Sequence, residues 1–346
     1  MSPVAVGVVG AGLSARSHAL DIITDGDMEL AGVVVGAGGS AEDFADTFGC
    51  ALAPDLPSLL SRVDAVVVAV PPSVVLDVVE AVTDRGTACL VEKPLAVTLA
   101  ERDRLARLAD AGAAVVAPYN RRYATHPRWA AEQLAGGAIG PVTEVEAMWV
   151  GPFRDRFAPG AATYRSAAGR GHGVLLDSGS HAIDLLGLLL GDVRFDVEDC
   201  ELTCNPTGAE IAAGLRMRHR FGAAVRLTIR DADPSPGADT TGAACTPSEH
   251  WTCTVRGERG ELVVDADGAQ LRRPGTPARS VSAGELDRPV TDLHRMLSGG
   301  TASPLGTGLP QVVQLSDLLI EVLGDEPSRR WVRPRGKALG RLNGAC

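Results

Sequence analysis

Short, unbroken apolar runs alternate with helical segments through the first 120 residues, and this rhythm constrains the fold most strongly. Within each run polar and apolar residues do not alternate, which is typical of strands buried on both faces. The predicted strands are residues 4–9, 30–35, 65–70, 88–91 and 113–116, and the predicted helices are residues 14–24, 41–48, 74–84 and 99–111. This order predicts a Rossmann domain, a doubly wound parallel sheet with helices on both faces, over residues 1–122.

After residue 122 the rhythm changes to one that predicts a separate α+β domain over residues 123–346. Its charged and apolar residues partly alternate, as in an open, mainly antiparallel sheet with one exposed face. The expected strands are residues 142–150, 198–204, 214–220, 223–230, 251–256 and 262–266. We expect helices at 127–136 and 309–323, a segment at 174–190 that begins extended and becomes an apolar helix, and a long loop at 231–247.

The loop after the first predicted strand, Gly10-Ala11-Gly12-Leu13-Ser14-Ala15, fits the pattern G-x-G-x-x-G/A. The first glycine permits a tight turn, and the second lets the backbone approach a pyrophosphate at the amino end of the next helix. The small third residue allows the helix to pack on the strand. We therefore predict a dinucleotide site formed by Gly10, Gly12, Leu13, Ser14 and Ala15; the alternative is an ordinary glycine-rich turn.

The end of the second strand does not decide between NAD and NADP. The carboxylate that usually binds the adenosine ribose there is replaced by Val35, and no arginine follows that would bind a 2′-phosphate. Arg16 lies near the phosphate loop and is either a ligand of the cofactor or a solvated residue on the helix surface. The sequence therefore predicts NAD or NADP.

The tripeptide Glu92-Lys93-Pro94 directly follows the predicted strand 88–91. Ligands of open α/β sheets bind beyond the carboxyl ends of the strands. Among the 33 basic residues only Lys93 and Lys337 are lysines, so this chain uses arginine where charge alone suffices. An amine can exchange a proton with a hydroxyl or carbonyl, which arginine cannot do. Lys93 is therefore a candidate catalytic residue; the alternative is a loop in which Glu92 forms a salt bridge.

Asp177 and His181 lie four residues apart at the start of an apolar helix. This spacing places both side chains on one helix face. An imidazole can transfer a proton to or from a substrate, and a nearby carboxylate can fix its tautomer. The alternative is that Asp177 caps the helix and His181 belongs to the core.

The chain resembles the glucose-fructose oxidoreductase/inositol dehydrogenase (Gfo/Idh/MocA) family over nearly its whole length. The resemblance is carried by Gly10-Ala11-Gly12, His18, Val70-Pro71-Pro72, Glu92-Lys93-Pro94, Tyr119-Asn120-Arg121-Arg122-Tyr123, Gly136-Gly137-Ala138-Ile139-Gly140 and residues 171–181. It implies that Lys93 and His181 act on the reacting group and that Asp177 orients substrate. The chain differs from the family pattern at Val35, at Val75 in place of a common histidine, and at Gly171-His172-Gly173 in place of three glycines.

The resemblance extends the list of candidate site residues. Asn120 matches a residue that lines the nicotinamide and substrate pocket, and the predicted cofactor ligands include Val35, Val70, Pro71, Glu92, Lys93 and Asn120. Further candidates for positioning substrate are Arg122, Tyr123 and Arg165. Some relatives that reduce nucleotide-linked keto-sugars have tyrosine at the place of His181, so this chain looks more like the polyol and sugar dehydrogenase branch.

We therefore expect an NAD(P)-dependent oxidoreductase that transfers a hydride between nicotinamide and a secondary alcohol or ketone of a sugar, cyclitol or similar metabolite. The active site is expected in the cleft between the two domains. The alternatives are a lyase or hydrolase that retains NAD and oxidises its substrate transiently, and a dinucleotide-sensing regulator without turnover. The resemblance also implies a homodimer or homotetramer formed through the open sheet.

Charge and composition limit the partners and the location of the chain. A net charge of −10 without basic runs argues against binding to nucleic acid or anionic membranes. The amino terminus lacks the basic region of a signal peptide and the apolar stretches are too short to span a bilayer, so we expect a cytoplasmic protein. The seven cysteines are scattered, with only Cys200 and Cys204 close together, so we expect reduced thiols and no metal site.

Overall fold

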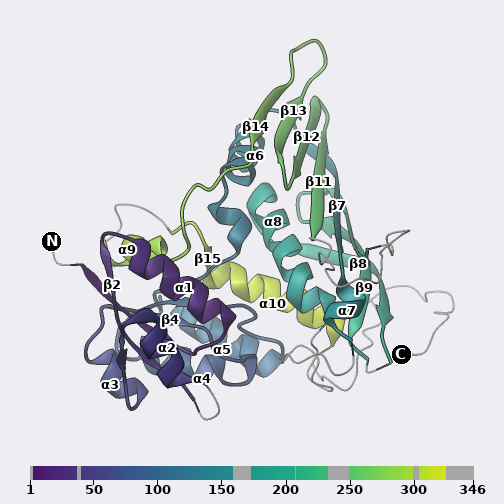
Figure 1. The fold of residues 1–346 in the computed structure, drawn as a ribbon. Coiled ribbons are helices and arrows are strands. Elements are labelled where there is room, and N and C mark those ends of the chain that lie inside the picture. Colours follow the sequence, from purple (N-terminus) through teal and green to yellow (C-terminus); the bar gives the residue numbers. More distant parts are fainter. Residues whose placement is uncertain are drawn as a thin grey trace, which may run out of the picture. The chain divides into compact units, whose positions relative to one another are not determined.

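The computed structural model describes residues 3–36, 40–158, 173–206, 208–232, 249–298 and 304–324 (Figure 1). The chain divides into two compact units. Unit 1 comprises Met1–Tyr123 together with Glu285–Ser316, and unit 2 comprises Ala124–Gly284 together with Asp317–Cys346. One domain was expected over residues 123–346, whereas in the structure residues 285–316 belong to the first unit.

Unit 1 contains a mainly parallel sheet with the strand order β15-β6-β5-β4-β1-β2-β3 among its described residues. The strands are β1 (Val4–Val9), β2 (Met28–Val34), β3 (Ala51–Leu52), β4 (Ala65–Val68), β5 (Ala88–Val91), β6 (Val115–Ala117) and β15 (Thr307–Gly308). Only the pairing of β15 with β6 is antiparallel in this sheet. The order from β3 to β6 is that of the dinucleotide-binding Rossmann fold, in which ligands bind where the strand order reverses, beside β1 and β4.

The helices of unit 1 cover the apolar strands. They are α1 (Leu13–Thr24), α2 (Ala41–Phe48), α3 (Leu56–Leu60), α4 (Pro72–Thr83), α5 (Leu99–Asp110) and α9 (Thr291–Leu297), with the 3-10 turn η1 (Asn120–Tyr123). The start of α5 is a capping box, since Thr98 accepts from the Glu101 amide while Glu101 accepts from the Thr98 amide. Residues of α1 and α2 share one buried core with β1, β2 and β4.

The returning segment is joined to unit 1 through Asp292, whose side chain is fully buried in α9. Its Oδ2 accepts from the Tyr123 hydroxyl at 2.6 Å and from the Gly306 amide at 2.7 Å. Its Oδ1 accepts from Arg295 and from the Leu305 amide, each at 2.7 Å. Burial, followed by the charge of Asp292, raises the pKa of Tyr123 above its ordinary value. One carboxylate thus satisfies four donors.

Replacement of Asp292 by asparagine should lower the free energy of unfolding by about 2 kcal/mol, because an amide nitrogen would face two of these donors. Urea denaturation measures the change. The matched control is Asp46→Asn on the exposed face of α2, which should change the stability by less than about 0.5 kcal/mol. Equal stabilities of the two variants would show that the Asp292 contacts contribute nothing measurable.

Unit 2 contains a mainly antiparallel sheet with the order β14-β13-β12-β11-β7-β10-β9-β8 among its described residues. The strands are β7 (Val142–Gly151), β8 (Phe195–Cys204), β9 (Glu210–His219), β10 (Ala224–Asp231), β11 (His250–Gly257), β12 (Gly260–Asp265), β13 (Gly268–Arg272) and β14 (Arg279–Ser282). Only the central pair of β7 and β10 is parallel in this sheet. The helices are α6 (Thr125–Ala135), α7 (Phe153–Arg156), α8 (Ser180–Leu190), preceded by the π-helix η3 (Leu175–Gly179), and α10 (Leu309–Leu323), in which the boundary between the units falls.

The two faces of this sheet differ in chemistry. Side chains such as Val145, Trp149 and Leu227 are buried on one face. On the other face Glu146 forms ion pairs with Arg226 at 3.2 Å and with Arg256 at 2.8 Å. Alternation along each strand accounts for the difference.

The structure confirms the predicted fold class and most of the predicted elements. It corrects the expectation that residues 174–190 begin extended, because Val174 is already helical and η3 leads directly into α8. No predicted element corresponds to the following elements, most of which are short: β3, α3, α7, β13, β14, α9 and β15. Residues 233–247, the greater part of the predicted loop at 231–247, lie outside the described residues.

The described cysteines form no disulfide. Cys200 and Cys204 both lie in β8, where residues four apart are separated by ~13 Å and cannot ligate one ion. Burial raises the pKa of Cys89 and of Cys253 to about 12, so both thiols are protonated packing groups at neutral pH. In the part of the chain that the structure describes, no helix has the length and apolar character needed to cross a membrane.

Candidate active site

The parallel strands of unit 1 bring the predicted cofactor residues to one edge of the sheet. Parallel strands all end at the same edge, and each of these residues follows the end of a strand. They are Gly10 and Gly12 after β1, Val35 after β2, Val70 and Pro71 after β4, Glu92 and Lys93 after β5, and Asn120 after β6. The structure therefore places the two motifs, the phosphate loop and Glu92-Lys93-Pro94, at the same edge of unit 1.

The phosphate loop has the geometry that a dinucleotide requires. Gly10 has φ +115°, and a Cβ there would lie 2.2 Å from the carbonyl oxygen of Ala69, so only glycine fits. A Cβ on Gly12 would meet no protein atom within 4 Å. The amino end of α1 has no side-chain cap, and its first residue Leu13 is 89% exposed. Free N–H groups and open space at a helix amino end suit a pyrophosphate.

Among the described residues 35, 36 and 40, the end of β2 contains neither a carboxylate for the adenosine ribose nor an arginine for a 2′-phosphate. Val35 is partly buried. Arg16 of α1 forms an ion pair with Asp43 of α2, and its guanidinium lies 5.6 Å from the centre of the Phe44 ring. These contacts give Arg16 a role in the packing of α1 against α2, and the choice between NAD and NADP stays open.

The turn after β5 is held by a buried histidine. The amide of Glu92 donates to the Val68 carbonyl of β4 at 2.9 Å. Oε1 of Glu92 lies 2.8 Å from Nε2 of His18 in α1. Lys93 is partly buried immediately beyond this contact. The Glu92 side chain therefore links the turn that carries Lys93 to the helix that follows the phosphate loop.

The residues around η1 divide into exposed and buried ones. Asn120 is exposed, and its Oδ1 accepts from Arg121 at 2.9 Å. Arg122 and Tyr123 are only 5% and 3% exposed. Arg122 donates to Gln311 at 3.3 Å, and Tyr123 donates to Asp292. Arg122 and Tyr123 therefore have structural contacts within unit 1, and their role in positioning substrate stays a prediction.

Unit 2 contains the other predicted catalytic pair. Asp177 lies in η3 and His181 in the first turn of α8, and both are partly buried. Nη1 of Arg156 in α7 lies 3.1 Å from Oδ2 of Asp177 and 3.7 Å from Glu249. The sequence analysis missed Arg156, because 21 residues separate it from Asp177 and no motif joins them. Inserted π-turns occur often at functional sites, where they redirect side chains.

The glycine before η3 is required by close packing. A Cβ on Gly173 would lie 1.9 Å from the carboxyl carbon of Glu210, a residue that is 1% exposed at the start of β9. Gly173 thus fixes the approach of the buried Glu210 carboxylate to the start of the segment that carries Asp177. His172 and the predicted substrate residue Arg165 lie outside the described residues.

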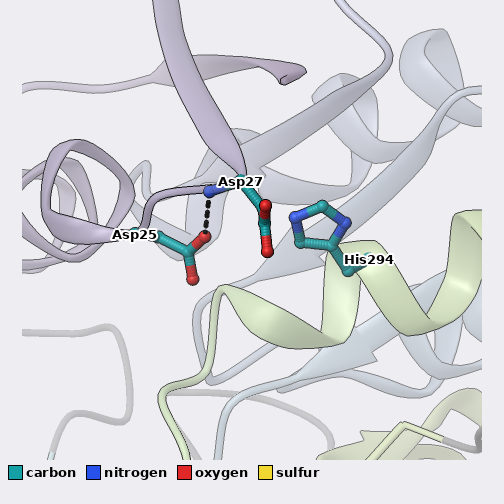
Figure 2. Close-up of side chains that lie close together, drawn as sticks. All are labelled: Asp25, Asp27 and His294. Atoms are coloured by element: carbon teal, nitrogen blue, oxygen red, sulfur yellow. Dashed lines mark hydrogen bonds between the residues drawn. The ribbon is translucent and has the colours of Figure 1, made fainter. Parts of the chain in front are cut away.

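A separate cluster in unit 1 consists of Asp25, Asp27 and His294 (Figure 2). One potential ligand atom from each lies within 4.8 Å of the others, and the amide of Asp27 donates to Asp25 Oδ1 at 3.0 Å. Carboxylates and imidazole are ligands for divalent cations. Asp25 and Asp27 precede β2, however, so the cluster lies at the amino edge of the sheet, opposite the edge that carries Lys93.

Two family models match most of the chain. Residues 4–119 match the model described as "Oxidoreductase family, NAD-binding Rossmann fold", and residues 128–263 match the one described as "GFO/IDH/MocA C-terminal domain". The first match covers the phosphate loop and Lys93, and the second covers Asp177 and His181. The phosphate loop, Lys93 and the pair Asp177 and His181 therefore all lie within regions that the family models describe.

The individual relatives are similar to this chain at low sequence identity. An inositol 2-dehydrogenase of Rhizobium meliloti (strain 1021) is 30% identical over 189 residues, which are 54% of each chain. A dTDP-3,4-didehydro-2,6-dideoxy-alpha-D-glucose 3-reductase of Streptomyces violaceoruber is 34% identical over 42% of each chain. The chain thus matches about half the length of these curated relatives. The structure of a UDP-N-acetylglucosamine 3-dehydrogenase from Acidithiobacillus ferrooxidans has a TM-score of 0.73 at 20% identity over 95% of this chain and 99% of that one, a similarity of fold.

Proposed function

Since the chain belongs to the GFO/IDH/MocA family of oxidoreductases with an NAD-binding Rossmann fold, we propose that it reversibly transfers a hydride between NAD(P) and a secondary alcohol or ketone. The substrate class is a sugar, cyclitol or sugar-like metabolite. One observation carries the proposal. Lys93 lies on the same sheet edge as the open phosphate loop, the edge along which a dinucleotide bound to that loop would extend.

The proposed chemistry divides between cofactor and protein. The nicotinamide, when bound, supplies the hydride acceptor or donor. Lys93 would hydrogen-bond to the oxygen of the reacting carbon, taking its proton during oxidation and returning it during reduction. His181 would share this proton transfer. The carboxylate of Asp177, which forms an ion pair with Arg156, would accept a hydrogen bond from a hydroxyl group of the substrate and so position it.

The proposed substrate class rests on the names of the relatives and on the presence of His181. One relative is named for a cyclitol, and two others are named for nucleotide-linked sugars. Each of these molecules presents a secondary alcohol or a ketone on a ring carbon. His181, rather than a tyrosine, favours a polyol or free sugar over a nucleotide-linked keto-sugar as the first substrates to test.

The assay is formation of reduced cofactor from NAD or NADP with a panel of cyclitols, sugars and nucleotide-linked sugars. In this assay His181→Asn should lower kcat by about a hundredfold, since general acid–base groups contribute at least this much. Cofactor affinity should stay within about twofold of wild type. His250→Asn, an exposed histidine of β11, is the matched control. Wild-type turnover by His181→Asn would remove His181 from the mechanism.

We also propose that the polar face of the unit 2 sheet forms a homodimer or homotetramer interface. Glu146, Arg226 and Arg256 give this face both charges, which suits pairing with a second copy. Met148, 39% exposed on the same strand as Glu146, adds apolar surface. A cytoplasmic location stays a prediction.

A further inference from the structure

We propose that His18 is a positioning residue, which fixes the turn carrying Lys93 through its hydrogen bond to Glu92. This inference rests on the proposed function of Lys93. It concerns how the chain holds its catalytic amine in place, and it assigns a purpose to a buried polar contact that the proposed reaction does not itself use.

The first support is the geometry of the contact. His18 lies in the middle of α1 and is 5% exposed. Its Nε2 is 2.8 Å from Oε1 of Glu92, whose side chain is 21% exposed. The two residues are 74 positions apart in the sequence, so the contact joins separate elements. A hydrogen bond to a carboxylate is among the stronger protein hydrogen bonds.

The second support is the other ring nitrogen of His18. Nδ1 is buried and has no hydrogen-bond partner within the described structure. Burying an unsatisfied polar atom costs stability, and an apolar side chain of similar size would avoid this cost. The bond from Nε2 to Glu92 is therefore the contact that distinguishes histidine from leucine at this position. Packing alone does not account for the imidazole.

The third support is the position of the two partners in unit 1. α1 starts at the phosphate loop, and Glu92 immediately precedes Lys93. The Glu92 amide is already bonded to β4, so the side-chain contact fixes the residue from a second direction. A residue held at both backbone and side chain limits the movement of its neighbour. Through Glu92, the helix that would bind the pyrophosphate also sets the position of the Lys93 amine.

The test uses His18→Leu and His18→Gln in the full chain. Leucine fills the space without a donor, whereas the glutamine amide nitrogen reaches about as far from Cβ as Nε2 does. We expect His18→Leu to lower kcat by about tenfold, the equivalent of one lost hydrogen bond to a charged group. The KM for the cofactor should stay within about twofold. His18→Gln should regain most of the lost activity.

A second readout does not depend on turnover. Lys93 and Lys337 are the only lysines, so acylation by an amine-selective reagent followed by peptide mass spectrometry reports on Lys93, with Lys337 as internal reference. His18→Leu should raise the labelling rate of Lys93 relative to Lys337 by about tenfold, because the turn opens more often. The matched control is His126→Leu, which replaces an equally buried histidine in unit 2 and should not alter the ratio.

The outcomes separate this inference from the proposed function. A wild-type labelling ratio in His18→Leu, or equal defects in the leucine and glutamine variants, would overturn the positioning role. If His18→Leu does not fold, Glu92→Gln weakens the same contact from the other side and should raise the labelling ratio. The wild-type protein could oxidise no polyol or sugar while His18→Leu still raises the labelling of Lys93 relative to Lys337. This result would support the positioning role and contradict the proposed reaction.

Discussion

Lys93→Ala is expected to lower kcat by about three to four orders of magnitude while cofactor affinity stays within about twofold of wild type. The amine is proposed to exchange the proton of the reacting oxygen, and no other lysine lies in the described part of the chain. The phosphate loop, which is proposed to bind the cofactor, is untouched by the substitution. Steady-state kinetics and a cofactor titration by fluorescence give the two quantities.

Two further variants sharpen this result. Lys93→Arg should stay as inactive as Lys93→Ala, because a guanidinium keeps its charge but cannot exchange its proton at neutral pH. Lys337→Ala, the same change at the other lysine, should leave kcat unaltered. Recovery of activity in Lys93→Arg would show that position 93 supplies charge only, and full activity in Lys93→Ala would end its catalytic role.

Gly12→Ala is expected to weaken cofactor binding by about a thousandfold without loss of stability. Gly12 has φ −72° and ψ −176°, which any residue adopts, and an added Cβ meets no protein atom within 4 Å. In the proposed complex this space is taken by the pyrophosphate. Loss of two hydrogen bonds to the phosphates, each worth about 1.5–3 kcal/mol, corresponds to this fall in affinity.

The matched control for this variant is Gly26→Ala. Gly26 also has open space around it, but it lies before β2 at the opposite edge of the sheet. Both variants should unfold at the wild-type urea concentration, and only Gly12→Ala should bind reduced cofactor weakly. Wild-type affinity in Gly12→Ala would place the cofactor elsewhere, whereas a common loss of stability would make the effect structural.

The Rossmann part of the fold was predictable because its signals are local. Each buried strand of that sheet is a run of apolar residues, and Gly10 marks the turn that only glycine can make. The return of residues 285–316 was not predictable in this way. It involves contacts between residues far apart in the sequence, such as the hydrogen bond from Tyr123 to Asp292 and the pairing of β15 with β6, which local patterns do not predict.

The candidate site shows the same division. Lys93 and the phosphate loop were found because each directly follows a strand. Glu92 contacts His18, and Asp177 contacts Arg156. Each contact joins elements that are far apart in the sequence, so no spacing rule predicts it. The i, i+4 spacing of Asp177 and His181 predicts one shared face only in a regular α-helix, whereas Asp177 lies in η3 and forms an ion pair with Arg156. The hydrogen bond from Tyr123 to Asp292 in the returning segment likewise could not be predicted from local spacing.

The most direct test of the proposed function follows a deuterium atom from substrate to cofactor. The enzyme is incubated with NAD or NADP and with myo-inositol or a sugar of the panel, deuterated at its secondary carbinol carbons, and the nicotinamide is analysed by mass spectrometry. Reversible hydride transfer predicts one reduced cofactor, carrying one deuterium, for each ketone formed. Product that accumulates without any net reduced cofactor would contradict this account and would indicate a lyase or hydrolase that retains NAD.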